Sequence, residues 1–296
     1  MSDAVTPKPP SSGSSGSGGS GGSNSSGGGA VGSFGRIGAV AVNTFREAVR
    51  NRVLAVLVLF AVGLMAFSVV LGQLSLHEEE RIIKDLGLSG ISIFSVFIAL
   101  FLGVNLLSKE LDKKTVYAII PKPLYRWEFL LGKYFGLVLT MAILVFVMSL
   151  VLAGFVWFQD GHHGVVMVRA EILIMLEVVL LIAVAMLFAS FSSPYLSAMF
   201  TGALWVIGRN TAELSAFAER SDQSPALQEL LHGVIAVVPD FRLFFISGAN
   251  LGEEVVSVHG AFVDWSYVAQ ALAYGGAYGA TCLVLAILLF ARRDFT

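Results

Sequence analysis

Two charged residues interrupt long apolar stretches of the sequence, and they are the clearest candidates for specific chemistry. Glu177 and Arg209 each lie in a run that is otherwise free of charge. An ionised side chain in such surroundings is costly unless a partner or water compensates it. We therefore predict a Glu177–Arg209 ion pair that holds two helices together. Two alternatives stay open: the pair lines a path for a solute, or Arg209 reaches polar headgroups while Glu177 is protonated or bonded to a hydroxyl.

Two other motifs superficially suit catalysis or metal binding, but their context argues against both. The acidic run that ends at Arg81 has a glutamate pair like that of membrane-embedded CAAX-type proteases, yet no apolar segment supplies a partner histidine. A hydrolase needs a base and an activated water in a protected site. His162 and His163 are adjacent, without nearby cysteine or a spacing that suits zinc. We therefore expect no catalytic, cofactor-binding or metal site in this chain.

The distribution of charge defines the class of protein. The chain has 296 residues, of which 56% are hydrophobic and 14% charged, whereas soluble domains carry about 25% charge. Its long charge-free runs match the roughly 20 apolar residues that cross a bilayer as a helix. A net charge of -2 argues against a nucleic-acid partner. The lone Cys282 excludes an internal disulfide.

The predicted fold is an all-α integral membrane protein with six transmembrane helices. The predicted spans are residues 53–72, 88–107, 134–158, 172–191, 195–211 and 266–290. Glu177 falls in the fourth span and Arg209 in the fifth, and the short turn between these spans makes them antiparallel neighbours. Counting at about 1.5 Å per residue places both charges roughly 9 Å below the outer interface.

Lysine and arginine set the predicted orientation. Residues 36–52, the loop between spans two and three, and the C-terminal tail together carry 12 of these residues, against 5 in the three other loops. Basic residues are retained on the cytoplasmic side. Both termini and the loop at 108–133 are therefore expected in the cytoplasm, and the loops at 73–87, 159–171 and 212–265 outside.

Three further segments flank the spans. Residues 1–32 are Gly/Ser-rich and predicted to be a disordered tail, whether a natural extension, a tether or a cloning remnant. The remaining 33–296 form the membrane domain. Residues 36–52 alternate apolar and basic groups, which predicts an amphipathic helix on the inner surface or, alternatively, an extension of the first span. Apolar positions in 227–238 and 241–245 predict outer interfacial helices or a small outer cap.

The loop between spans two and three has the pattern of a docking element. A charged helix is expected at 108–119, and Pro121 and Pro123 stop it, because proline lacks the N–H and clashes with the preceding turn. A second helix restarts near Tyr125 and enters the third span. Such a cytoplasmic helix-turn-helix would contact a soluble partner and pass its movement to two spans at once.

The sequence here resembles the permeases of ABC exporters of the ABC-2 type. The matching positions in and after the loop are Glu110, Thr115, Pro123, Arg126, Glu128, Gly132 and Lys133. Residues 81–88, 101–103 and 292–295 are similar to a bacterial branch that includes permeases of nitrous-oxide-reductase maturation. The resemblance covers about residues 36–296, although Lys114 stands where the family usually has glycine.

The resemblance implies a permease subunit in a bacterial inner membrane, coupled through these residues to an ABC ATPase subunit that binds the ATP. It also implies a second permease subunit, identical or related. The chain lacks G-x-x-x-x-G-K-[ST], so we expect no ATP site of its own. The alternatives are a non-transporting scaffold or a secondary carrier, although carriers usually have more intramembrane polar groups and internal repeats.

The orientation can be tested by labelling single cysteines in a Cys282→Ala background. Gly161→Cys and Gly252→Cys should react with an impermeant thiol reagent added outside intact cells, because both positions are predicted to face outward. Lys113→Cys should not react until the cells are opened. Labelling of the Lys113→Cys variant from outside would reverse the predicted topology.

Overall fold

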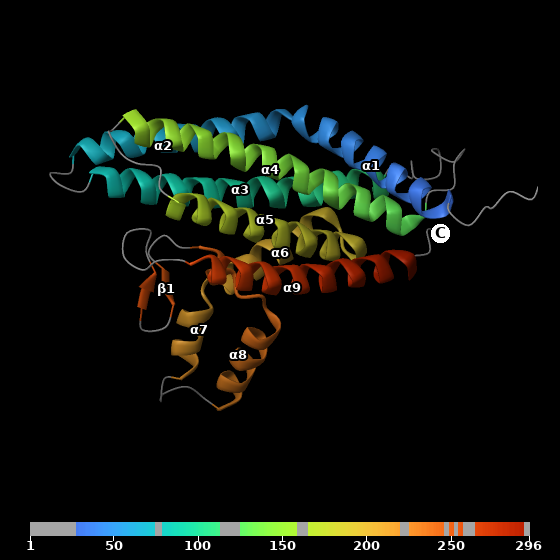
Figure 1. Cartoon of the computed structure of the whole chain (residues 1–296). Helices are drawn as coiled ribbons and strands as arrows, with labels where there is room; N and C mark the ends of the chain where they lie inside the picture. Colours follow the sequence, from blue (N-terminus) through green and yellow to red (C-terminus); the bar gives the residue numbers. More distant parts are fainter. Residues whose placement is uncertain are drawn as a thin grey trace, which may run out of the picture.

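Long helices lie side by side in one bundle, and a shorter pair projects from its flank (Figure 1). The computed structural model describes residues 28–74, 79–112, 125–158, 165–219, 225–245, 249–251, 254–256 and 264–292. The helices are α1 (Gly28–Val49), α2 (Arg52–Leu74), α3 (Glu79–Asp112), α4 (Arg126–Phe158), α5 (Val165–Phe191), α6 (Pro194–Arg209), α7 (Thr211–Ala218), α8 (Pro225–Val237) and α9 (Trp265–Arg292). A 3₁₀ turn, η2 (Phe241–Phe244), and a two-stranded antiparallel hairpin, β1 (Ala249–Leu251) and β2 (Glu254–Val256), complete the described elements.

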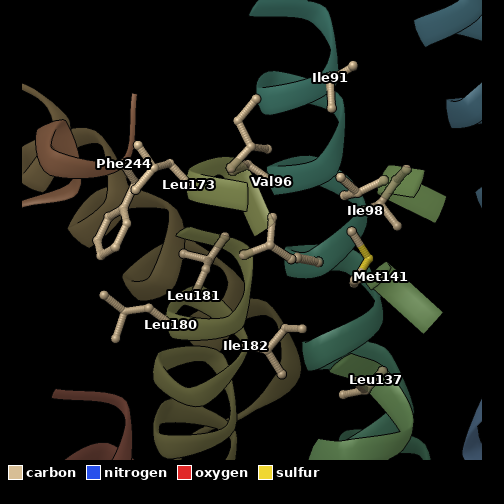
Figure 2. Close-up of a cluster of buried hydrophobic side chains, with 14 of the residues drawn as sticks. Ile91, Val96, Ile98, Leu137, Met141, Leu173, Leu180, Leu181, Ile182 and Phe244 are labelled. Carbon is tan, nitrogen blue, oxygen red and sulfur yellow. The ribbon is translucent and has the colours of Figure 1, made fainter. Parts of the chain in front are cut away.

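Five of these helices contain a stretch that is long and apolar enough to cross a membrane: α2, α3, α4, α5 and α9. They confirm a helical multi-pass membrane protein. The buried fraction of each span shows which helices lie at the centre of the bundle and which at its edge. In α3 and in α5, 67% of the most apolar stretch is buried, whereas in α2 and in α9 the buried share is 22%. Figure 2 shows the centre, where Leu173 and Leu181 of α5 lie near Val96 of α3 and Phe244 of η2.

The fifth predicted span, 195–211, is realised only as the shorter helix α6. Its 16 residues extend about 24 Å, less than the roughly 30 Å of a hydrocarbon core. Asn210 ends the helix because its backbone leaves the helical region, at φ -114° and ψ 30°. The Asn210 side chain donates to the Val206 carbonyl at 2.7 Å. The prediction that the helix runs past residue 209 is therefore wrong, and Arg209 is the last residue of α6.

Helix α1 packs along the first half of α4, with both helices running in the same direction. Arg36 lies beside Glu128, and a Cβ added to Gly132 would lie 2.6 Å from the Cβ of Val40. One turn further, a Cβ on Gly136 would lie 2.6 Å from the Ala41 carbonyl oxygen. The two glycines thus admit the backbone of α1, as small residues do at membrane helix contacts.

The structure refines the predictions for the segment before the first span. α1 begins at Gly28, inside the stretch predicted to be disordered, while residues 1–27 lie outside the described part. A break at Arg50 and Asn51 separates α1 from α2, so α1 is not an extension of the first span. Its contact with α4 is the clearest constraint on its position, and a location at the inner membrane surface stays a prediction.

The predicted loop elements are only partly described. The charged residues at 108–112 continue α3 rather than starting a separate helix, residues 113–124 lie outside the described part, and α4 begins at Arg126. On the other side of the bundle, α8 occupies the first predicted interfacial segment and pairs with α7. Phe241 and Phe244 are fully buried in the bundle rather than interfacial.

The close approach of α1 predicts unequal effects of one substitution at two glycines of α4. Gly136→Leu should destabilise the folded protein by roughly 1–3 kcal/mol, because the new side chain must displace α1. Gly154→Leu on the same helix is the matched control, since nothing lies within 4 Å of a Cβ added there. Thermal unfolding in detergent measures both variants. Equal melting temperatures for the two would show that α1 does not pack closely on α4.

Candidate functional site: a buried charge cluster

The structure brings Glu177 of α5 and Arg209 of α6 together inside the bundle. Nη1 of Arg209 lies 2.7 Å from Oε1 of Glu177. The Glu177 side chain is fully buried, and the Arg209 side chain is 17% exposed. The short turn between α5 and α6 makes these helices neighbours, as the sequence predicts, and the ion pair joins them near the end of α6.

Three further side chains complete the cluster and satisfy the carboxylate. Trp205 donates its indole N–H to Oε1 of Glu177 at 2.8 Å, and the Ser92 hydroxyl of α3 donates to Oε2 at 3.2 Å. The ring of Phe245, just after η2, lies 3.8 Å from the Arg209 guanidinium carbon. A buried carboxylate is tolerated when its oxygens accept several hydrogen bonds and a cation is close. The cluster therefore ties α3, α5, α6 and η2 together.

The cluster lies well inside two of the long helices. Glu177 is 12 residues from the start of α5 at Val165, and Ser92 is 13 residues from the start of α3 at Glu79. The depth of roughly 9 Å below the outer interface stays a prediction.

Tyrosines of α9 hold the chain segment that packs next to the cluster. Tyr274 accepts the backbone N–H of Asp240 at 3.0 Å. Tyr267 donates to the Leu243 carbonyl at 2.8 Å, and Tyr278 donates to the Val237 carbonyl at 2.6 Å. Buried backbone groups need such partners wherever the chain is not helical. These bonds explain why the segment containing η2 is drawn into the bundle.

The predicted coupling residues separate into buried and exposed ones. Glu128 is buried and accepts two hydrogen bonds from Arg36 of α1, at 2.7 and 2.9 Å. These bonds raise the pKa of the Arg36 guanidinium. Lys133 is also buried, 5.3 Å from the centre of the Phe129 ring, whereas Arg126 is exposed.

The remaining predicted residues are less fully described. Glu110 lies in the last turns of α3, and Gly132 forms the close contact with α1. Thr115 and Pro123 lie outside the described residues. Four of the predicted residues lie in α4, and Arg126 is the one of these four that is exposed. Among these four, a role in docking therefore suits mainly Arg126.

Sequence reasoning missed the partners that make both ion pairs possible. Ser92 and Trp205 carry no charge, and a single serine or tryptophan in a span is ordinary. Arg36 lies 92 residues before Glu128 in the sequence, so no local pattern links the two. The four-residue spacing of Gly132 and Gly136 is the signal in the sequence for close helix packing at this place.

Metal sites in proteins are built mainly from His, Cys, Asp and Glu side chains. No group of three or more His, Cys, Asp or Glu side chains that could hold a metal occurs among the described residues. His162 and His163 lie outside them, so the expectation that they bind no metal stays a prediction. The buried cluster satisfies the Glu177 carboxylate, positions the helices and leaves one edge of Arg209 unused.

The apolar helices and their internally satisfied charges define a multi-pass membrane protein. The family model described as "ABC-2 family transporter protein" matches residues 39–295. The chain therefore belongs to the ABC-2 transporter family, a membrane component of transport systems. A search of curated proteins finds no match. Membership in the nitrous-oxide-reductase maturation branch stays a prediction.

A double-mutant cycle measures the ion pair. Glu177→Gln and Arg209→Gln should each destabilise the protein by about 3 kcal/mol, because each leaves a charge without its partner in the bundle. The double variant Glu177→Gln/Arg209→Gln should lose clearly less than the sum, since it leaves no unpaired charge. Unfolding in mixed micelles gives the three free energies. Additive losses would mean that the two side chains do not interact in the membrane.

Proposed function

We propose that this chain is the membrane-spanning permease subunit of an ATP-driven transporter, with a separate ABC ATPase subunit supplying the energy. The family match across residues 39–295 carries the proposal. The absence of a P-loop sequence favours ATP binding on another chain. A non-transporting scaffold or a secondary carrier remains the alternative, and neither requires an ATPase partner.

The order of the helices supports six crossings, although α6 is short. α5 and α9 run in the same direction, because Arg169 near the start of α5 lies over Trp265 at the start of α9. Further along, Gly279 of α9 approaches Leu180 of α5. The chain must therefore return across the bundle between Phe191 and Trp265. We propose that α6 makes most of this fifth crossing and that the segment from α7 to η2 completes it.

Helices α3 and α4 are suited to carry movement from the cytoplasmic loop into the membrane. They contain 34 and 33 residues, which corresponds to about 50 Å each. The undescribed loop 113–124 joins their ends. Ser92 of α3 reaches the buried charge cluster, and the Arg36–Glu128 ion pair fixes the start of α4 against α1. A movement of this loop would thus be transmitted along the continuous helix α3 to the Glu177–Arg209 ion pair.

The remaining parts of the proposal concern the assembly. The positive-inside bias supports both termini in the cytoplasm of a bacterial cell and a location in its inner membrane. The largely exposed apolar surfaces of α2 and α9 are compatible with lipid and with a second permease subunit, identical or related. ATP is expected to bind the partner, so this chain needs no cofactor of its own.

A charge reversal at the exposed start of α4 tests the coupling. Arg126→Glu should remove most of the ATPase subunit from the purified complex, or abolish ATP-dependent transport, because a contact charge at the partner surface is reversed. The chain itself should still fold, since Arg126 is exposed. Copurification from native membranes, followed by a transport assay in vesicles, provides the measurement.

Arg126→Lys is the matched control, because it keeps the charge and should retain most copurification. Full copurification and full transport by Arg126→Glu would remove Arg126 from the docking surface. If the unsubstituted chain brings down no ATPase at all, the permease assignment itself fails.

A further inference from the structure

The guanidinium of Arg209 is only partly used by the ion pair. It carries five N–H donors, and Nη1 donates to Glu177 at 2.7 Å and to Ser92 at 3.3 Å. Within the described part of the chain, Nε and Nη2 have no hydrogen-bond partner, and neither is an enclosed atom. Since 17% of the side chain is exposed, the Nε/Nη2 edge faces an open surface.

The ion pair fixes the position of this open edge. Nη1 of Arg209 is bonded to the buried Glu177 carboxylate, so the guanidinium cannot swing away without breaking the ion pair. Uncompensated donors of a charged group are costly in hydrocarbon. The stacked Phe245 ring covers one face of the guanidinium but accepts no hydrogen bond in its plane.

Polar side chains lie close to Arg209. Asn210, the next residue, is exposed. Asp240 and Arg242 form a partly exposed ion pair at 3.0 Å, and Thr211, two residues after Arg209, donates to Asp240. Tyr274 of α9 accepts the backbone N–H of Asp240. These polar groups indicate contact with water rather than with acyl chains.

From these observations we infer that the Nε/Nη2 edge of Arg209 is an anion-binding point on a water-exposed surface at the end of α6. This inference rests on the proposed permease function. The two donors of this edge match the two oxygens of a carboxylate, sulfonate or phosphate group. The site would receive such a group on the transported substrate, while Glu177 holds the guanidinium in place.

Thiol-reactive ions of opposite charge test this inference directly. Val206 is 51% exposed and lies one turn before Arg209, so it shares the same helix face. In a Cys282→Ala background, Val206→Cys should react with a sulfonate-bearing thiosulfonate added to both faces of opened membranes. That anionic reagent should react faster than a trimethylammonium thiosulfonate, on the order of fivefold after correction for their rates with free thiol.

The preference should disappear when the charges are removed together. Val206→Cys combined with Glu177→Gln and Arg209→Gln leaves no unpaired buried charge and should react with both reagents at similar corrected rates. Phe146→Cys on α4 is the control for a lipid-facing site, because Phe146 is 63% exposed among apolar neighbours. This variant should react with neither reagent.

Two results would overturn the inference. If Val206→Cys reacts with neither reagent, lipid or a second subunit covers the surface. If it reacts equally with both while Arg209 is present, the surface is wet but Arg209 does not attract anions there. Labelling requires no ATPase subunit, so its outcome is separate from copurification, which tests the permease function.

Discussion

The constraint that shapes this protein is the burial of a charged pair in a membrane-spanning bundle. A carboxylate with no exposed surface requires a cation and several donors, and the chain supplies them from Arg209, Trp205 and Ser92. Because these groups come from three helices, α3, α5 and α6 cannot separate without exposing the charge. The pair also fixes the end of α6, where the chain leaves the helical path at Asn210.

The end of α6 leaves backbone groups that need hydrogen-bond partners. The segment from α7 to η2 follows, and Tyr267, Tyr274 and Tyr278 of α9 bond to backbone groups of this segment. At the other end, α1 closes on α4 through two glycines and the Arg36–Glu128 pair. The bundle is thus held by polar contacts at two levels and by apolar packing between them.

Much of the fold could be predicted from the sequence because lipid imposes simple rules on composition. Runs without charge predict six spans, of which five appear as membrane-length helices, and two lone charges on neighbouring spans predict an ion pair. The depth of that pair in the membrane stays a prediction. Local propensity did not predict the end of α6, which depends on Asn210. The burial of Glu128 was missed because the interaction spans 92 residues of sequence.

The most direct test of this account is an experimental density map of the chain in a lipid nanodisc, at a resolution that shows side chains. The account predicts that the Arg209 guanidinium contacts the Glu177 carboxylate inside the helix bundle. It also predicts that the free edge of Arg209 faces a region without acyl-chain density. An Arg209 side chain that points to the outer headgroups, with Glu177 bonded elsewhere, would contradict the account.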